Sequence, residues 1–113
     1  MGNNWRPNHE WIIVATNGKF KTKSNNKTNI LKHRRMSSQK MLHSCEKPLS
    51  LLEELIIEST EEGDVILDGF MGSNSTGHAC INTNRKFIGI ELDETYFNIA
   101  KQRISQAKDK LNV

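Results

Sequence analysis

The sequence predicts an α/β fold built around a small parallel sheet. Two short, wholly apolar runs, Val65–Leu67 and Phe87–Ile90, flank a loop rich in glycine and hydroxyl groups. Helical periodicity precedes the first run and follows the second. Apolar runs of this length are typical of parallel strands that are buried on both faces. The order strand, loop, helix, strand, helix predicts a βαβα unit with a right-handed crossover.

The N-terminal part of the chain predicts one further strand and then a long loop. Residues 9–16, HEWIIVAT, are rich in β-branched and aromatic side chains, and Asn17-Gly18 follows as a turn. Residues 17–43 show neither helical nor strand periodicity, so we expect a loop there.

Three helices are expected. Pro48 suits the first turn of a helix over residues 49–59, and Gly63 follows it as a stop signal. A short helix begins at His78–Ile81. Asp93 is a suitable N-cap for the clearest amphipathic helix, whose apolar positions are Phe97, Ala100, Ile104, Ala107 and Leu111.

Composition limits the class of protein. The 113 residues allow one small domain, divided into a strand region (1–16), a basic loop (17–43) and the βαβα unit (44–113). No apolar run could span a membrane and no secretory signal is recognised, so we expect a cytoplasmic protein with no membrane partner. The two cysteines, Cys45 and Cys80, fit no metal spacing, so we expect reduced thiols and no metal.

Charge is distributed unevenly along the chain. Residues 1–47 contain ten Lys and Arg against two acids, whereas residues 48–113 contain six against eleven. The basic stretch indicates either a polyanionic partner or a solvated loop, and charge alone leaves both open.

The loop Asp68–Gly77 has the position of a ligand-binding loop, between a parallel strand and the next helix. Glu91 follows Asp68 by 23 residues, a spacing typical of an acid that binds ribose hydroxyls. The loop has neither G-x-G-x-x-G nor a P-loop lysine. A carboxylate at Asp68 would repel phosphate and attract an ammonium or sulfonium group. These features favour a nucleoside ligand with little phosphate; the alternative is that the glycines only form a turn.

Three blocks in order resemble the DNA amino-methyltransferases that modify adenine N6 or cytosine N4. The first is HSCEKP at 43–48 with its leucine-rich helix, the second is VILDGFMGSNSTG at 65–77, and the third is RKFIGIE at 85–91 with Tyr96, Ala100 and Arg103. The resemblance covers about residues 43–105. It implies a partial Rossmann-like S-adenosylmethionine-dependent methyltransferase fold, with S-adenosylmethionine as cofactor and DNA as partner.

The resemblance also implies site residues. Those expected to border the cofactor are Lys47, Pro48, Asp68, Phe70, Gly72, Ser73, Ser75, Thr76, Glu91 and Leu92. The basic loop stands where the family has its DNA-recognition region, and its expected DNA contacts are Lys19, Lys21, Lys23, Lys27, Lys32, Arg34 and Arg35.

The sequence departs from the family pattern at several positions. Gly69 and Ser44 replace prolines, and Asn74 replaces a glycine, although asparagine tolerates positive φ. The family's catalytic Pro-Pro-aromatic motif is absent, because Pro7 and Pro48 are the only prolines. We therefore assign no catalytic residue and expect the C-terminal half of an enzyme, whose catalytic half lies on another chain or has been lost by truncation.

Three functions follow from these observations. The first is the cofactor-binding part of a DNA methyltransferase. The second is an inactive module that binds S-adenosylmethionine or DNA, and the third is a small basic DNA-binding protein. A strand at 65–68 without its second neighbour would expose an apolar edge, so a homo-oligomer is also expected.

Overall fold

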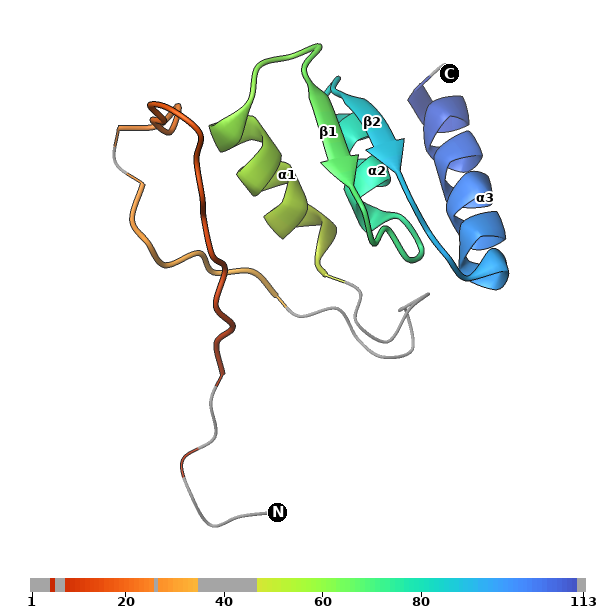
Figure 1. Ribbon diagram of the computed structural model, residues 1–113, viewed down its shortest axis with the longest axis horizontal. Coiled ribbons are helices and arrows are strands. Elements are labelled where there is room, and N and C mark those ends of the chain that lie inside the picture. The colour runs from red at the N-terminus through yellow and green to blue at the C-terminus, as the bar shows by residue number, and fades with distance from the viewer. Residues whose placement is uncertain (1–4, 6–7, 26, 35–46, 112–113) are drawn as a thin grey trace.

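The computed structural model of the chain describes residues 5, 8–25, 27–34 and 47–111 (Figure 1). Its elements are α1 (Leu49–Ser59), β1 (Val65–Asp68), α2 (Ser75–Asn82), β2 (Lys86–Gly89) and α3 (Glu94–Leu111). Arg35 and the block at 43–46 lie outside the described residues. None of the described helices has the length and apolar character needed to cross a membrane.

The predicted βαβα unit is confirmed. β1 and β2 pair in parallel, with Val65 opposite Lys86 and Asp68 opposite Gly89. α2 connects the two strands, and α3 follows β2. Within the described residues the sheet has these two strands only. Asp93 caps α3 as predicted, because its Oδ1 accepts a hydrogen bond from the Tyr96 N–H at 2.9 Å.

The core lies between the helices and one face of the sheet. Ile56 of α1 packs with Ala79 and Cys80 of α2. Ile66 of β1 and Phe87 of β2 cover this cluster from the sheet side. α3 contacts α2 and contributes two buried alanines, Ala100 and Ala107, at positions predicted to face the core. All of this packing uses one face of the sheet.

The described residues leave the opposite face of the sheet uncovered, so the expectation of strands buried on both faces is wrong for this part of the chain. The side chains of Val65, Leu67, Ile88 and Ile90 are 56%, 64%, 55% and 57% exposed. In Figure 1, α2 lies behind the sheet and no described helix lies in front of it. We call these four side chains the bare face.

The predicted strand at residues 9–16 is also wrong. These residues form neither helix nor strand, and Trp11 and Ile13 are 88% and 93% exposed. The segment passes outside α1 instead of joining the sheet (Figure 1). Its β-branched composition favours a strand, but a strand also needs a neighbour with which to exchange hydrogen bonds. In the structure residues 9–16 exchange no such bonds with β1 or β2.

Residues 17–25 and 27–34 lack helix and strand, as predicted for a loop, but they pack along α1. We call residues 19–25 and 27–34 the basic strap. Lys27 forms ion pairs with Glu54 and Glu58, and Ser24 donates to Glu58 from both its N–H, at 2.9 Å, and its hydroxyl, at 2.6 Å. His33 contacts Ser50 and Glu54. Ion pairs and hydrogen bonds to glutamates of α1 therefore attach the strap to this helix.

These contacts alter the acidity of the groups involved. Hydrogen bonds from Lys27 and His33 hold the pKa of Glu54 below its ordinary value, and bonds from Ser24 do the same for Glu58. The hydrogen bond to Glu54 in turn raises the pKa of Lys27. Both glutamates therefore keep their negative charge, and so their hold on the strap, at neutral pH.

Candidate functional site

The candidate site lies where β1 and β2 end and α2 begins. In a parallel sheet the carboxyl ends of neighbouring strands meet at one edge, so Asp68 and Glu91 come to the same side of the molecule. The first turn of α2 lies beside them, with its N–H groups directed toward this edge. The sequence predicted this arrangement, and the strand and helix order confirms it.

The loop between β1 and α2 turns sharply through two left-handed residues. Gly72 has a φ of 53° and Asn74 a φ of 71°. Asn74 is the N-cap of α2, and its Oδ1 accepts a hydrogen bond from the Gly77 N–H at 2.8 Å. The turn thus survives the replacement of glycine at position 74, as predicted. α2 begins at Ser75, earlier than the predicted His78.

Asp68 ties the loop to α2. Its Oδ1 accepts a hydrogen bond from the Phe70 N–H at 3.0 Å, and its Oδ2 accepts one from the Thr76 hydroxyl at 2.8 Å. The carboxylate remains partly exposed. Each carboxylate oxygen has a second lone pair, so Asp68 can still accept a bond from a ligand.

Glu91 ties the same loop to the end of β2. Its Oε1 accepts a hydrogen bond from the Gly72 N–H at 2.8 Å, and its Oε2 accepts one from the Asp93 N–H at 2.9 Å. Met71 adds a backbone bond to the Ile90 carbonyl at 3.0 Å. Both carboxylates of the site are therefore fixed in position by the backbone around them.

The remaining predicted cofactor residues differ widely in exposure. Phe70 and Leu92 are 95% and 100% exposed; Phe70 follows Asp68 by two residues and Leu92 follows Glu91 directly. Ser73 and Ser75 are buried, and the Ser75 hydroxyl accepts a hydrogen bond from Arg103 of α3 at 3.3 Å. The accessible part of the site consequently combines two carboxylates with two apolar side chains.

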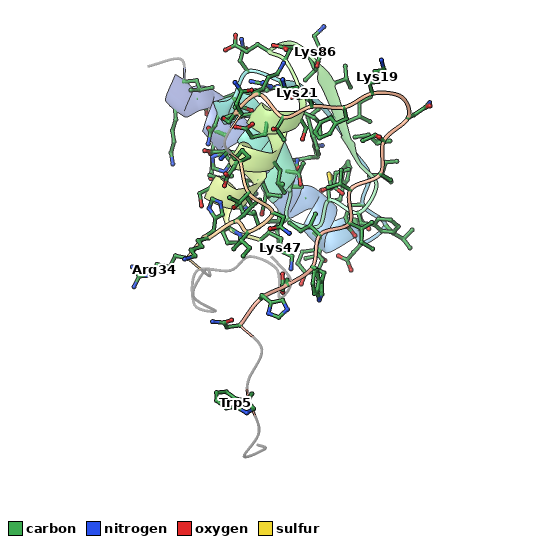
Figure 2. The ribbon with its side chains drawn as sticks, turned by 90° about the vertical axis from the view of Figure 1, so that its left-hand side faces the viewer. Trp5, Lys19, Lys21, Arg34, Lys47 and Lys86 are labelled. Carbon is green, nitrogen blue, oxygen red and sulfur yellow. The ribbon has the colours of Figure 1, made fainter. Side chains whose placement is uncertain are left out.

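Lys47 and Pro48 lie at the start of α1. The Pro48 carbonyl accepts hydrogen bonds from Leu51 and Leu52, which opens the helix as predicted. Lys47 forms an ion pair with Glu10 at 2.6 Å. Figure 2 keeps the vertical axis of Figure 1 and shows Lys47 toward the end of the molecule where the strands finish.

The residues predicted to contact DNA do not form one patch. Lys23 and Lys27 are paired with glutamates, whereas Lys19, Lys21, Lys32 and Arg34 have no ion pair within the described part of the chain. Lys19 and Lys21 lie toward the end of the molecule where β2 begins, whereas Arg34 lies toward the other end (Figure 2). The seventh residue, Arg35, is outside the described residues.

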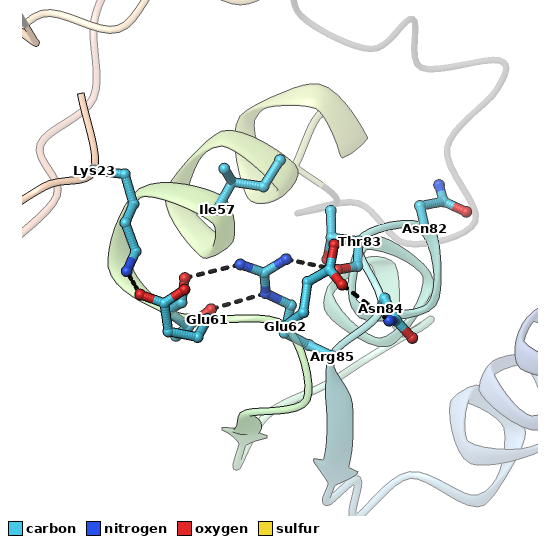
Figure 3. A pocket seen from close by; sticks show the side chains of 9 residues that line it. Lys23, Ile57, Glu61, Glu62, Asn82, Thr83, Asn84 and Arg85 are labelled. Carbon is cyan, nitrogen blue, oxygen red and sulfur yellow. Dashed lines mark hydrogen bonds and ion pairs between the residues drawn. The ribbon is translucent and has the colours of Figure 1, made fainter.

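A hollow of about 480 Å³ lies at the opposite end of the molecule from the two carboxylates, against the turns around residues 60–62 and 82–85 (Figure 3). Arg85 is one of the residues that line this hollow. The guanidinium donates to the Thr60 hydroxyl at 3.1 Å, the Thr60 carbonyl at 2.8 Å and the Thr83 carbonyl at 2.6 Å. It thereby joins the C-terminal ends of α1 and α2. Arg85 lies in one of the three blocks that resemble the family, but its structural role was not predictable from the sequence, because no local pattern shows which carbonyls a guanidinium reaches.

The described residues contain no group of three or more His, Cys, Asp or Glu side chains arranged to hold a metal ion. The free thiol of Cys80 is fully buried, and burial raises its pKa to about 11. A thiol in this state is a poor nucleophile at neutral pH. Its packing in the core was predicted, and is confirmed.

Comparison with known proteins identifies relatives of more than half of this chain. A family model described as DNA methylase (N6_N4_Mtase) matches residues 2–102. The type II methyltransferase M2.DpnII of Streptococcus pneumoniae is 44% identical over 70 residues, which are 62% of this chain and 26% of that protein. The chain therefore spans about a quarter of the length of this relative.

Two solved structures show the same arrangement. The M1.HpyAVI complex titled with SAM has a TM-score of 0.60 and 39% identity, covering 76% of this chain and 44% of that one. The PvuII DNA methyltransferase, titled cytosine-N4-specific, has a TM-score of 0.52 and 30% identity, covering 62% of this chain and 27% of that one. These likenesses support a partial Rossmann-like fold.

Proposed function

Because the chain belongs to the DNA methylase family of the N6/N4 type, we propose that residues 47–111 form the S-adenosylmethionine-binding part of a DNA amino-methyltransferase. The observation that carries this proposal is the pair of fixed carboxylates, Asp68 and Glu91, at the ends of adjacent parallel strands. M1.HpyAVI, whose title names a SAM complex, supports the choice of ligand.

The chemistry of the donor set suits this cofactor. S-adenosylmethionine carries ammonium and sulfonium charges, ribose hydroxyls and no phosphate. Carboxylates attract the cations and accept hydrogen bonds from hydroxyls, whereas they would repel a phosphate. The exposed side chains of Phe70 and Leu92 can cover an apolar adenine ring. The N-terminus of α2 favours a carboxylate such as that of the methionine part.

The residues of the chain act here by binding and orienting. Glu91 would accept bonds from the ribose hydroxyls on the lone pairs that Gly72 and Asp93 leave free. Asp68 would face the cationic part of the methionine group. S-adenosylmethionine, when bound, supplies an electrophilic methyl group. Holding that group in one orientation is the contribution that this part of the fold can make to the rate.

Methyl transfer needs groups that the 113 residues do not include. An exocyclic amine of adenine or cytosine must be gripped and brought to the methyl group, and it must lose a proton as the new N–C bond forms. The family motif for this task is absent from the sequence. We propose that a further segment supplies it, for methyl transfer to adenine N6 or cytosine N4. DNA would be contacted by the unpaired cations Lys19, Lys21, Lys32 and Arg34.

Two measurements test the proposal. Calorimetry of the purified chain should show binding of S-adenosylmethionine and none of ATP, whose phosphates the carboxylates would repel. A chain that binds neither would support a small DNA-binding protein instead. Incorporation of labelled methyl groups into DNA should stay at the level of a heat-inactivated control, because the catalytic motif is absent. Cofactor binding without methylation, even when the remainder of a relative is supplied, would favour the inactive binding module.

A further inference from the structure

The contact between the basic strap and α1 belongs neither to the proposed cofactor site nor to the bare face. Ser50, Glu54 and Glu58 follow one another at intervals of four residues, so they lie along one side of the helix. Glu61 follows the end of the helix by two residues. We call Glu54, Glu58 and Glu61 the acidic stripe. Each of its three carboxylates forms an ion pair with a lysine of the strap.

The strap runs antiparallel to α1, and its contacts follow in regular order on the side of the helix away from β1 (Figure 1). From the C-terminal end of the helix to its N-terminal end, the pairs are Lys23 with Glu61 (Figure 3), Ser24 with Glu58, Lys27 with Glu54, and His33 with Ser50. Strap residues of rising number thus meet helix residues of falling number. The strap therefore has a defined position along the whole length of α1.

Charge and hydrogen bonding attach the strap, with little apolar burial. None of the described strap residues is buried, and the side chains of Phe20 and Ile30 are 45% and 68% exposed. In the pair at the end of the helix, the side chains of Lys23 and Glu61 are 43% and 72% exposed. Ion pairs at such exposure are weak and are screened by salt. Another polyanion can therefore replace the carboxylates.

A DNA strand offers the strap the same kind of partner. Glu54 and Glu58 lie about one helical turn apart, which is about 6 Å along the axis. The phosphates of a nucleic-acid strand also form a row of single negative charges. A lysine ammonium is a compact charge with three donors, and it pairs with either group. Lys27 cannot bind both rows at full strength, so a phosphate that takes Lys27 must displace the glutamates.

We propose that the acidic stripe competes with DNA for the basic strap. In the free chain the stripe withholds Lys23 and Lys27, and the unpaired cations alone are available to phosphate. When DNA binds, the strap leaves the stripe and all of its lysines contact phosphates. DNA binding is consequently weaker, and less sensitive to salt, than the composition of the strap would give. The proposal rests on the proposed function for the choice of DNA as the partner.

The test removes the negative charges of the stripe and keeps the shape of its side chains. Fluorescence anisotropy measures the binding of a short labelled DNA duplex. Glu54→Gln with Glu58→Gln should bind the duplex about three- to tenfold more tightly than the wild type at low salt, because each exposed ion pair contributes no more than about fivefold. The slope of log affinity against log salt should steepen by about one unit for the freed Lys27. Glu54→Gln alone, which keeps both Ser24 bonds to Glu58, should show part of the gain.

Two controls separate competition from a general change in charge. Glu94→Gln with Asp109→Asn removes two exposed carboxylates from α3, and this pair should raise the affinity less. In a chain that already carries Lys27→Ala, the two glutamine substitutions should add no more than the α3 pair does, because the lysine that they free is absent. An equal gain from the α3 pair, or a full gain in the presence of Lys27→Ala, would overturn the proposal.

A second measurement follows the strap itself. On saturation with the duplex, the Ser24 amide resonance of the wild type should move toward its position in the double glutamine variant, since both states lose the charged partner of this N–H. A resonance that stays in place while DNA is bound would show that the strap remains on α1, and would overturn the proposal.

Neither measurement needs the cofactor, so the two proposals can fail separately. A chain that shows the gain in DNA affinity and fails to bind S-adenosylmethionine would contradict only the proposed function. A chain that binds S-adenosylmethionine and shows no gain would contradict only the competition between the acidic stripe and DNA. Urea denaturation checks that every variant is folded.

Discussion

The carboxylate of Glu91 and the backbone N–H of Gly72 are joined by a hydrogen bond of 2.8 Å. The residue expected to bind the ribose is thus also the residue that fastens the glycine-rich loop to the end of β2. A ligand would meet a carboxylate whose position is already fixed, which lowers the entropic cost of binding.

Replacing Glu91 should therefore weaken cofactor binding. For Glu91→Ala we expect a loss of about 1–3 kcal/mol in the binding free energy of S-adenosylmethionine, the range for hydrogen bonds to a charged group. Calorimetry measures the effect, and urea denaturation checks that the variant is folded. Asp109→Ala, which removes an equal charge from an exposed position on α3, is the control. An affinity for Glu91→Ala equal to that of the control would remove Glu91 from the site.

The unpaired lysines of the strap should contribute more to DNA binding than the paired ones. Removing both Lys19 and Lys21 should reduce the slope of log affinity against log salt by about one unit per lysine. Removing Lys23 and Lys27 should reduce the slope less, because glutamates already neutralise them. Lys108→Ala with Lys110→Ala on α3 is the charge-matched control. Equal slopes for all three double variants would show that the strap makes no specific DNA contact.

Acid should release the strap from α1. The pKa values of Glu54 and Glu58 are lowered from 4.5 in the folded chain, so their contacts are complete above that pH and are lost as the pH falls below it. The Ser24 amide resonance, which reports its bond to Glu58, should shift across this range. Glu54→Gln with Glu58→Gln should speed trypsin cleavage after Lys27 at neutral pH, whereas Asp109→Asn should not. Unchanged cleavage in the double variant would contradict the packing of the strap.

The thiol of Cys80 should be unreactive while the chain is folded. A rise in its pKa from 9.0 to about 11 cuts the thiolate fraction at pH 8 about a hundredfold, and burial slows the reaction further. In the Cys45→Ser variant, whose only cysteine is Cys80, iodoacetamide should react quickly only after denaturant is added. Because the folded state holds this proton more tightly, stability should also fall as the pH rises from 9 toward 11. Rapid alkylation of the native variant would contradict this burial.

Features that depend on local chemistry were predictable from the sequence. The two strands, the left-handed Asn74 and the Asp93 cap all follow from residues within a few positions of one another. The start of α2 was placed too late, because Ser75, Thr76 and Gly77 are poor helix formers and indicated a loop. The Asn74 cap outweighs their low propensity.

Features that depend on distant partners were not predictable. Lys27 and Glu54 are separated by 27 residues in sequence, and no pattern in the strap indicates which helix it will contact. The exposure of Val65 and Leu67 has the same origin. An apolar run indicates that a strand suits burial on both faces, but it does not show whether another element covers each face. Residues 9–16 illustrate the point, as a strand-forming composition without a neighbour gives no strand.

Because of the cap at the start of α2, the residues that position 77 can accept depend on the residue at position 74. A Cβ added at Gly77 would lie 2.4 Å from the Asn74 Oδ1, so any other residue at 77 would displace the side chain that holds the turn. With glycine at position 74 that obstacle would be absent. The effect of a mutation at 77 therefore depends on which residue stands at 74. A chain with glycine at position 74 could accept alanine at 77, whereas a chain that has acquired Asn74 must keep Gly77, and the order of the two mutations decides which intermediates stay folded.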